Sequence, residues 1–431
     1  MPTRPLQSPA CRSSRLRHHL AGCAAGWWLV GLVVSGCTGE FDLPAYDGKG
    51  LRYPLALAVD PSQRYVYAVG ANFDRAHHGG VVSAIDTKTD TYVQAGRAEV
   101  PSFAAGLLLD VDLDPSGALR RRLYVPARDD DSVTVLDVQS EGAGTSSEGP
   151  PRLACGRSEA GLGTCSASHR IGGENVGDLD LGQDPVAVGL QRLPGDAVVL
   201  HVAAVSDGRV TALALSDAAG GGVKAKTLTS LTLGFGLSSL VVADLSGRVY
   251  VGDSRANRLH AYGLDPDGKG GWQPTSAAGV GLPRATSSEF GRGAALSSDG
   301  GRLYVAYRSP NALLVIDVAP SATGEPRDVL VDVIGLGGRP AQVAVAPVGP
   351  GGRDFVYVAC FGSDDIWVVD PELRRVVEVI RLEHSPYGLA IADVPGRGRL
   401  LYAAIFSRHR VAVIPIDEGA AERHQVVARI E

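Results

Sequence analysis

The stretch DFVYVACFGSDDIWVVDPELRRVVEVIRL, residues 354–382, contains three short runs of β-branched and aromatic residues. The runs are Phe355–Cys360, Ile366–Asp370 and Arg375–Leu382, and short polar segments separate them. Runs of this length, bounded by Gly, Asp and Pro, are typical of antiparallel strands joined by tight turns. The stretch therefore predicts three consecutive strands of one small sheet.

The same plan recurs along the chain as a strand, a polar turn and a second strand that ends in Asp. It is present at Arg121–Asp137, Gly247–Asp265 and Gly301–Asp317. The first strand of this pair carries a tyrosine, or in one unit a histidine, at a matching position. These positions are Tyr67, Tyr124, His201, Tyr250, Tyr304, Tyr357 and Tyr402. Their spacing indicates seven units of roughly 50 residues.

Four short strands per unit, with no helical periodicity, predict an all-β, seven-bladed β-propeller of four-stranded antiparallel blades. A single blade cannot bury both of its faces, whereas a closed ring of blades buries each face against the next. Six or eight blades are the alternatives, because the third unit matches the pattern weakly. We expect the ring to occupy residues 51–431, with residues 140–183 as a Gly- and Ser-rich loop insertion.

Residues 1–36 differ from the repeats. Four arginines within the first 17 residues precede the apolar run Leu20–Val34, and the segment has no acidic residue. A basic segment followed by an apolar run of about 15 residues is typical of an export signal, whereas a membrane-spanning helix needs about 20. A retained membrane anchor is the alternative. Loss of this leader changes the formal net charge from −6 to −10, and no basic stripe with interleaved aromatic residues indicates nucleic acid binding.

The sequence Val34-Ser35-Gly36-Cys37 directly follows the apolar run and resembles the cleavage signal of bacterial lipoproteins. The resemblance implies cleavage before Cys37 and attachment of a diacylglycerol to its sulfur, which would anchor the chain to a membrane. It therefore implies an exported protein of the cell envelope, with residues 37–50 as a tether. The alternative is an ordinary cleavage site followed by an incidental cysteine.

Three further cysteines lie within the predicted propeller. Cys155 and Cys165 occur in the Gly- and Ser-rich insertion, and in an exported protein such a pair predicts a disulfide. A metal site is the alternative, for which His169 is the only further ligand nearby in the sequence. Cys360 lies within a predicted strand, and we expect it to be a buried free thiol.

The strand pairs LYVPARDDDSVTVLD and VYVACFGSDDIWVVD, and the leading segment PLALAVDPSQRYVYAVG, resemble the YVTN-type β-propeller repeat. The resemblance covers essentially all of residues 51–431. It implies the fold and little about function, because this broad group includes binding proteins and lipoproteins of unknown role. Related propellers include lactonases and the haem-bearing propeller of nitrite reductase. A lactonase-like hydrolase or isomerase and a periplasmic redox propeller are therefore alternatives to a binding or scaffold module.

In propellers of this kind, the turn before strand one and the turn between strands two and three open on the same face. Arg52, Arg292, Arg308 and Arg339 fall in such turns. Guanidinium groups bind carboxylates and phosphates through paired hydrogen bonds, so these arginines predict a site for a small anionic ligand at the axial funnel. The alternative is that the turns are polar because they are solvated, with each arginine paired to a nearby aspartate. Another protein of the envelope is the other expected partner.

Asp110 and Asp112 alternate with Val111 on the predicted first strand of the second unit. Because this strand is the innermost, we expect both carboxylates to line the axial channel, where such a pair suits Ca²⁺. The run DVDLDPSG only half resembles a calcium loop, because its Gly is misplaced and no Glu follows at the required spacing. The alternative is a solvated pair or a pair that caps backbone N–H groups. We predict no other cofactor.

Catalytic signals are few. The sequence lacks Gly-x-Ser-x-Gly, His-Glu-x-x-His and the phosphate-binding Gly-Lys-Ser/Thr loop. His77 and His78 form a loop pair that we expect to be solvated, and His384 is the one candidate axial ligand for a haem. The sequence therefore favours a lipid-anchored binding or scaffold module over an enzyme.

Overall fold

The computed structural model describes most of the chain from residue 50 onward. The described residues are 44, 50–114, 116–142, 148–156, 165–173, 179–253, 255–269, 271–276, 279–283, 293–324 and 327–431. The expected export signal, Cys37 and the predicted binding residue Arg292 lie outside them. Leu43–Glu431 form one compact unit. No helix among the described residues is long and apolar enough to cross a membrane.

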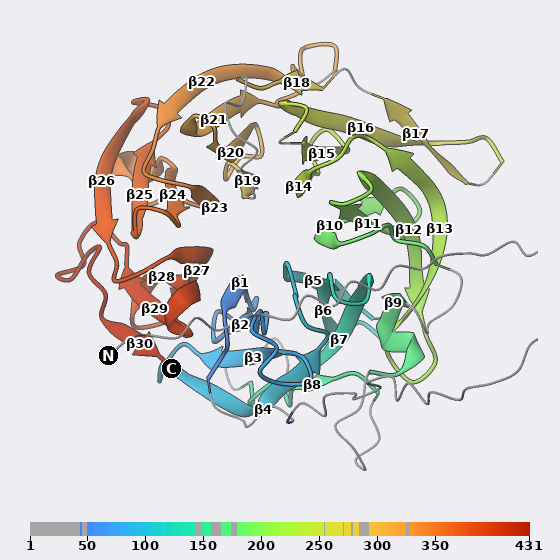
Figure 1. The fold of residues 1–431 in the computed structure, drawn as a ribbon, viewed down its shortest axis with the longest axis horizontal. Coiled ribbons are helices and arrows are strands. Elements are labelled where there is room, and N and C mark those ends of the chain that lie inside the picture. Colours follow the sequence, from blue (N-terminus) through green and yellow to red (C-terminus); the bar gives the residue numbers. More distant parts are fainter. Residues whose placement is uncertain are drawn as a thin grey trace, which may run out of the picture. The chain divides into compact units, whose positions relative to one another are not determined.

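Seven antiparallel sheets surround a central axis, and each sheet is one blade of a propeller (Figure 1). The first strand of each blade lies nearest the axis, and the later strands follow outward to the rim. The helical elements of the described ranges are three short 3-10 turns, η1 (Ala167–His169), η2 (Pro350–Gly352) and η3 (Phe406–Arg408). The prediction of a seven-bladed propeller is confirmed, and six or eight blades are excluded.

Each blade uses consecutive strands of the chain, so the strand numbers rise from the axis to the rim. Blade 1 contains β1 (Pro54–Val59), β2 (Tyr65–Gly70), β3 (Gly80–Asp86) and β4 (Thr91–Val100). Blade 2 contains β5 (Leu108–Leu113), β6 (Leu119–Ala127), β7 (Ser132–Gln139) and β8 (Arg152–Ala154), with β9 (Arg170–Gly172) also paired to β7. Blade 3 contains β10 (Pro185–Leu193), β11 (Ala197–Ala204), β12 (Arg209–Asp217) and β13 (Val223–Thr232).

The remaining four blades repeat this order. Blade 4 contains β14 (Leu237–Ala243), β15 (Arg248–Asp253), β16 (Arg258–Pro266) and β17 (Trp272–Ser276), with β18 (Val280–Gly281) also paired to β16. Blade 5 contains β19 (Ala294–Leu296), β20 (Arg302–Arg308), β21 (Asn311–Asp317) and β22 (Val329–Gly335). Blade 6 contains β23 (Pro340–Ala346), β24 (Phe355–Cys360), β25 (Asp365–Asp370) and β26 (Arg375–Arg381). Blade 7 contains β27 (Pro386–Val394), β28 (Gly398–Ile405), β29 (Arg410–Pro415) and β30 (Ala428–Ile430).

Residues 140–183, which we expected to be a loop insertion, supply the short outer strands β8 and β9 of blade 2. Cys155 and Cys165 form the predicted disulfide, with Cα atoms 5.1 Å apart. Both are buried with Leu153 in a hydrophobic cluster between blades 1 and 2, so the disulfide fastens this segment to the core. Cys360 is a buried free thiol, as predicted, and burial raises its pKa to about 12.

The matched tyrosines of the second strands are buried between blades, and each of the six is at most 1% exposed. In blade 3 the equivalent residue is His201, which accepts a hydrogen bond from Tyr262 at 2.6 Å and contacts Gln191 Oε1 at 3.0 Å. Burial lowers the pKa of His201 to about 3, so the imidazole is neutral. The repeated aromatic position therefore belongs to the core between blades.

Blades 7 and 1 close the ring by packing, because all described strands of blade 7 come from the end of the chain and those of blade 1 from its beginning. A shared hydrophobic cluster includes Leu57 of blade 1 and Tyr402 of blade 7. Arg397 donates two hydrogen bonds of 2.8 Å to the carboxylate of Asp90 across the same seam. Closure places loops from the two ends of the sequence side by side.

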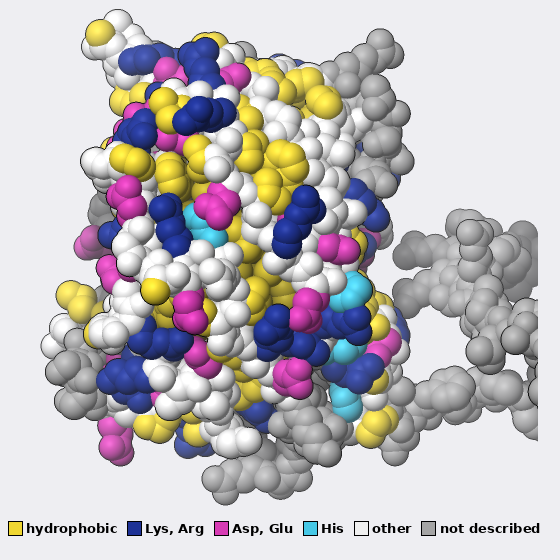
Figure 2. All heavy atoms as spheres, turned by 90° about the vertical axis from the view of Figure 1, so that its left-hand side faces the viewer, with side chains coloured by type: hydrophobic (Ala, Val, Ile, Leu, Met, Phe, Trp, Pro, Cys, Tyr) yellow, Lys and Arg dark blue, Asp and Glu magenta, His cyan; other side chains and the backbone are white. Residues whose placement is uncertain are grey.

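The rim of the ring is mixed in character. Figure 2 views it from the side on which β26 lies and shows hydrophobic side chains interleaved with basic and acidic ones. The outermost strands expose several valines, such as Val331 of β22 and Val377 of β26. Apolar and charged groups are mixed on this side of the ring.

Candidate functional site

Two sets of turns meet on one side of the ring, which we call the top face. They are the turns before the first strand of each blade and the turns between its second and third strands. Six aromatic residues lie in or next to these turns in blades 6, 7, 1 and 2, and we call them the aromatic cluster. They are Tyr53, Phe73, Phe103, Phe361, Tyr387 and Phe406. All six are partly exposed.

Phe406 lies at the centre of this cluster. Its ring centroid is 5.0 Å from that of Tyr53, 5.5 Å from Phe73, 5.8 Å from Phe361 and 6.3 Å from Tyr387. These separations are typical of attractive aromatic contacts. The rings hold one another in place while part of each stays open to solvent, which gives a rigid apolar platform.

The local backbone explains how Phe406 reaches its neighbours. It follows β28 directly and begins the turn η3, which ends at His409 in the left-handed conformation, with φ of 57°. The Nδ1 atom of His409 accepts a hydrogen bond of 3.0 Å from the backbone N–H of Tyr53. Burial, and then the charge of Arg52, lower the pKa of His409, which favours the neutral ring that can accept this bond. The seam between blades 7 and 1 thus sets the geometry of the platform.

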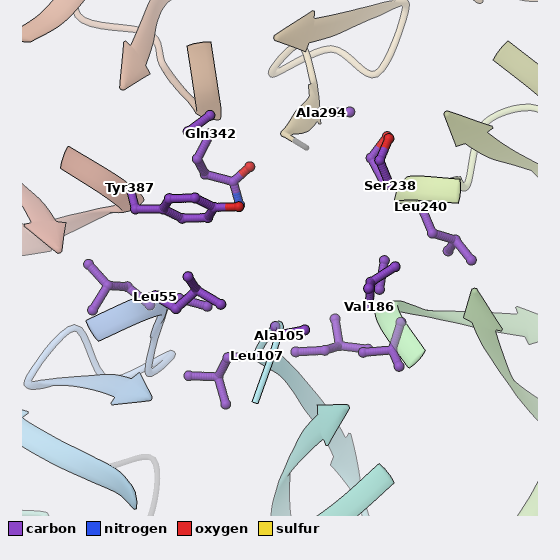
Figure 3. A pocket seen from close by; sticks show the side chains of 17 residues that line it. Leu55, Ala105, Leu107, Val186, Ser238, Leu240, Ala294, Gln342 and Tyr387 are labelled. Carbon is purple, nitrogen blue, oxygen red and sulfur yellow. The ribbon is translucent and has the colours of Figure 1, made fainter. Parts of the chain in front are cut away.

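An axial cavity of about 200 Å³ opens beside the aromatic cluster. Its walls are mostly apolar and include Leu55 and Leu107. The polar side chains among its described lining residues are Ser238, Ser239, Gln342 and Tyr387. Figure 3 shows the side chains of Gln342 and Tyr387 pointing into the cavity and toward each other. Tyr387 belongs to both features and joins the cavity to the platform.

The three described arginines of the predicted anion site occupy different places on the top face. Arg52 pairs with Asp74, and this hydrogen bond lowers the pKa of Asp74. Arg308 donates to the carbonyl of Pro340 at 2.8 Å, and Arg339 lies over the ring of Phe361 at 5.6 Å. None of the described residues that line the axial cavity is an arginine. By lying over Phe361, Arg339 contacts the aromatic cluster.

The two predicted calcium ligands each contact an arginine. Asp110 accepts a hydrogen bond from Arg192, and Asp112 accepts one of 3.0 Å from Arg120. Within the described part of the chain, no three or more His, Cys, Asp or Glu side chains are grouped to hold a metal ion. Calcium binding stays a prediction.

Sequence reasoning identified the turns of the top face but missed the aromatic cluster. Phe361 and Phe406 each follow the second strand of a blade directly, which is a recurring signal that can be found in the sequence. Their contact with each other and with Tyr53 depends on ring closure. His384, the candidate haem ligand, contacts the side chain of Arg408 through Nε2.

No family model matches the chain, and no curated protein matches it. Many solved structures are similar. One is named "putative 6-phosphogluconolactonase", from Bacteroides uniformis, with 16% identity over 82% of this chain and 93% of that one and a TM-score of 0.56. Chaetomium thermophilum Sqt1 has 13% identity over 90% and 88% of the two chains and a TM-score of 0.53. Kuenenia stuttgartiensis hydrazine synthase has 15% identity over 86% and 97%, with a TM-score of 0.51.

These similarities show the fold alone, because all three identities are low and the three names differ in function. The chain is a seven-bladed β-propeller with lactonase-like propellers among its structural neighbours. The YVTN-type resemblance and the lipoprotein signal stay predictions.

Proposed function

We propose that this protein is a lipid-anchored binding module of the cell envelope that takes a small ligand on the top face of its propeller. The observation that carries the proposal is the aromatic cluster beside the axial cavity. Rigid aromatic rings supply large contact area at low cost in conformational entropy, and a largely apolar cavity with a few polar groups is typical of ligand sites. The ligand that fits best has a flat or apolar ring and an acidic group.

Two arginines supply the preference for an acidic group. The guanidinium of Arg339 lies over Phe361, and that of Arg75 lies 4.9 Å from the ring centroid of Phe103. Stacking on a ring holds a guanidinium in place, and Arg75 is held further by a hydrogen bond of 2.5 Å to Asp129. The two guanidinium groups therefore place positive charge at the edge of the aromatic cluster, which favours a ligand with an acidic group.

Binding is favoured over catalysis at this position because of the groups in the cavity. Its described lining has hydroxyl and amide side chains and no carboxylate or imidazole. General acid–base catalysis most often uses an imidazole or a carboxylate. The arrangement therefore suits recognition better than turnover.

The test is a thermal-shift screen of the full chain against small aromatic and cyclic carboxylates and phosphates, followed by calorimetry of any hit. Phe406→Leu keeps most of the volume but removes the central ring, and we expect it to weaken binding at least 10-fold, or about 1.4 kcal/mol. Phe235→Leu is the matched control, because Phe235 is 60% exposed and precedes blade 4, away from the aromatic cluster. Equal affinity in Phe406→Leu and the wild type would refute the proposal.

A lactonase-like hydrolase or isomerase is the second candidate, favoured by the similarity to the Bacteroides uniformis structure. Incubation with a panel of lactones tests it, with Tyr387→Phe as the variant that removes the hydroxyl at the cavity. Turnover that this variant abolishes would support an enzyme. The redox alternative predicts a bound cofactor that absorbs visible light, so the absorption spectrum of the purified protein tests it.

Anchoring is tested separately from binding. Cys37→Ala removes the sulfur that would carry the lipid, so we expect the protein to move from the membrane to the soluble fraction of the cell envelope. Membrane association that survives this substitution would exclude the lipid anchor and leave the ligand proposal untouched.

A further inference from the structure

Three polar side chains meet in hydrogen-bonding contact at the outer part of blade 2, on the face opposite the top face. Asp137 lies near the end of β7, His169 ends η1, and Ser166 directly precedes η1. His169 Nε2 is 3.0 Å from Asp137 Oδ2, and Ser166 Oγ is 2.9 Å from His169 Nδ1. A hydroxyl, an imidazole and a carboxylate in series are the parts of a nucleophilic hydrolase.

The direction of the hydrogen bonds follows from the chemistry of the carboxylate. An ionised aspartate only accepts hydrogen bonds, so a neutral His169 must carry its proton on Nε2, facing Asp137. Nδ1 then has a free lone pair and accepts from the hydroxyl of Ser166. This is the arrangement in which the imidazole acts as general base toward the serine. The two ring nitrogens have exchanged the roles that they have in the serine proteases, and either nitrogen can accept a proton.

Asp137 is held ionised by further donors. Arg122 Nε donates to its Oδ1 at 2.8 Å, and the backbone N–H of Gly222 donates to Oδ2 at 2.9 Å. Burial alone would raise the pKa of Asp137, but hydrogen bonds from His169, Arg122 and Gly222 bring it well below its ordinary range. The carboxylate is therefore suited to orient His169 and to stabilise the imidazolium that forms during a proton transfer.

Glycines allow the three groups to approach. A Cβ at Gly156 would lie 2.3 Å from Ser166 Oγ, and one at Gly221 would lie 2.8 Å from Asp137 Oδ2. Gly156 and Gly221 have φ of 69° and 106°, a region that other residues rarely adopt. The backbone thus packs against the hydrogen-bonded series where a side chain would push it apart. His169 is 2% exposed, while Ser166 is partly exposed.

A small cavity lies beside Cys155 and Gly156, which are next to Ser166 in space, although Ser166 is not one of its described lining residues. It measures about 130 Å³ and is lined by Gly156 and Cys155 together with Arg97 and Arg152 from the outer strands of blades 1 and 2. The backbone N–H of Ser166 donates to the carbonyl of Cys155 at 2.9 Å, so the serine and the cavity wall are directly connected. The Cys155–Cys165 disulfide ends one residue before Ser166 and fixes this connection. Two guanidinium groups at a cavity of this size favour a small substrate with an anionic group.

We propose that Ser166, His169 and Asp137 form an esterase centre for small carboxylic esters that carry an acidic group. Ser166 Oγ attacks the ester carbonyl and gives its proton to Nδ1 of His169, forming the bond from Oγ to carbon. The bond from carbon to the alcohol oxygen breaks, and His169 returns the proton to the departing alkoxide. Water then attacks the acyl-serine by the same route, which yields the acid and restores Ser166. This centre is independent of the ligand site on the top face.

The direct test is labelling of the full, disulfide-bonded chain with diisopropyl fluorophosphate, which bonds to an activated serine oxygen with loss of fluoride. We expect one adduct, located on Ser166 by peptide mass spectrometry. Ser166→Ala should abolish the adduct, and His169→Gln should slow its formation by about 100-fold or more, since a positioned general base contributes about that much. Ser168→Ala is the matched control and should label as the wild type does.

Ser168 is a discriminating control because its Oγ lies 3.2 Å from the same Nδ1 atom. Absence of an adduct, an adduct on Ser168 alone, or an unchanged labelling rate in His169→Gln would each overturn the proposal. Thermal unfolding of each variant, with the disulfide verified by mass spectrometry, shows that the fold is intact. For the substrate class, we expect faster hydrolysis of 4-nitrophenyl hemisuccinate than of 4-nitrophenyl acetate, and a reversed preference would overturn it.

Discussion

The two faces of the propeller are held together by different interactions. On the top face, the aromatic cluster around Phe406 combines ring contacts with partial exposure. On the opposite face, ion pairs join the turns, and Arg121 is the most buried example, contacting Asp60 at 2.7 Å and Glu148 at 2.6 Å. Ion pairs also join turns of the top face, such as Arg75 with Asp129, and the opposite face exposes Leu113 and Leu245. The difference between the two faces is therefore the aromatic cluster itself. This difference is why we place the ligand site on the top face.

The charged interactions of the opposite face also bind the blade 2 segment to the ring. Arg121 is 1% exposed, and Glu148, one of its two acidic partners, comes from the range 140–183. Tyr67 donates a hydrogen bond of 2.7 Å to Asp60, the other partner. A buried network of this kind is costly to leave incomplete. It makes the opposite face the more sensitive of the two to single substitutions.

The largest expected effect comes from Arg121→Met. Loss of the guanidinium leaves Asp60 and Glu148 buried without their cation, which typically costs about 3–5 kcal/mol. Arg52→Met on the top face is the matched control, since its pair with Asp74 is partly solvated and worth about 1 kcal/mol or less. Urea unfolding measures both. Equal losses of unfolding free energy in the two variants would contradict the expected difference in sensitivity between the two faces.

The second effect is that of removing the disulfide by the double substitution Cys155→Ala and Cys165→Ala. Removal of a disulfide that closes a short loop typically lowers the free energy of unfolding by about 2–4 kcal/mol. We expect this loss in the free energy of unfolding, together with slower labelling of Ser166, because the disulfide positions the chain next to it. Normal labelling in a destabilised protein would show that the disulfide acts on stability alone.

The third effect concerns pH and the layer between the two faces. His201 stays neutral in the folded protein because its pKa is lowered to about 3, whereas the unfolded chain takes up a proton below about 6.5. The unfolded state therefore binds more protons as pH falls, and stability declines by about 1.4 kcal/mol per pH unit below pH 6.5. In His201→Gln, unfolding measured from pH 7 to about 5 should lose this slope. If the dependence of stability on pH is unchanged in His201→Gln, it arises from other titratable groups.

The smallest effect is that of Phe406→Leu on stability. Aromatic pairs add about 0.5–1.5 kcal/mol beyond burial, and most of the volume is kept, so we expect a loss of about 1 kcal/mol. Phe235→Leu should stay within about 0.5 kcal/mol of the wild type. The loss of ligand affinity expected for Phe406→Leu is at least as large as this loss of stability. The same variant therefore tests whether the cluster serves recognition or only the structure. A loss above about 3 kcal/mol would show that the ring serves the core.

Much of the fold could be predicted from local patterns. The strand pair at Phe355–Asp370 reads directly as a hairpin, and its repetition indicates the blades. The disulfide and the buried Cys360 follow from their positions in a loop and a strand. The candidate site was harder to predict. A polar turn such as the one that contains Arg308 indicates exposed residues, but it does not indicate which way each side chain points. Arg308 faces a backbone carbonyl, and Asp110 faces Arg192, neither of which a local pattern specifies.

By itself the sequence determined the β-propeller architecture, because alternating apolar residues and tight turns act over a few neighbouring positions and repeat along the chain. The structure decided between seven blades and the alternatives of six or eight. Only the tertiary structure decided which turns meet. Tyr53 and His409 are 356 positions apart, yet they share a hydrogen bond because blade 7 packs against blade 1. Likewise, Asp137 reaches His169 only because the blade 2 segment folds back onto β7. Both proposed sites depend on such long-range packing, which local preferences do not encode.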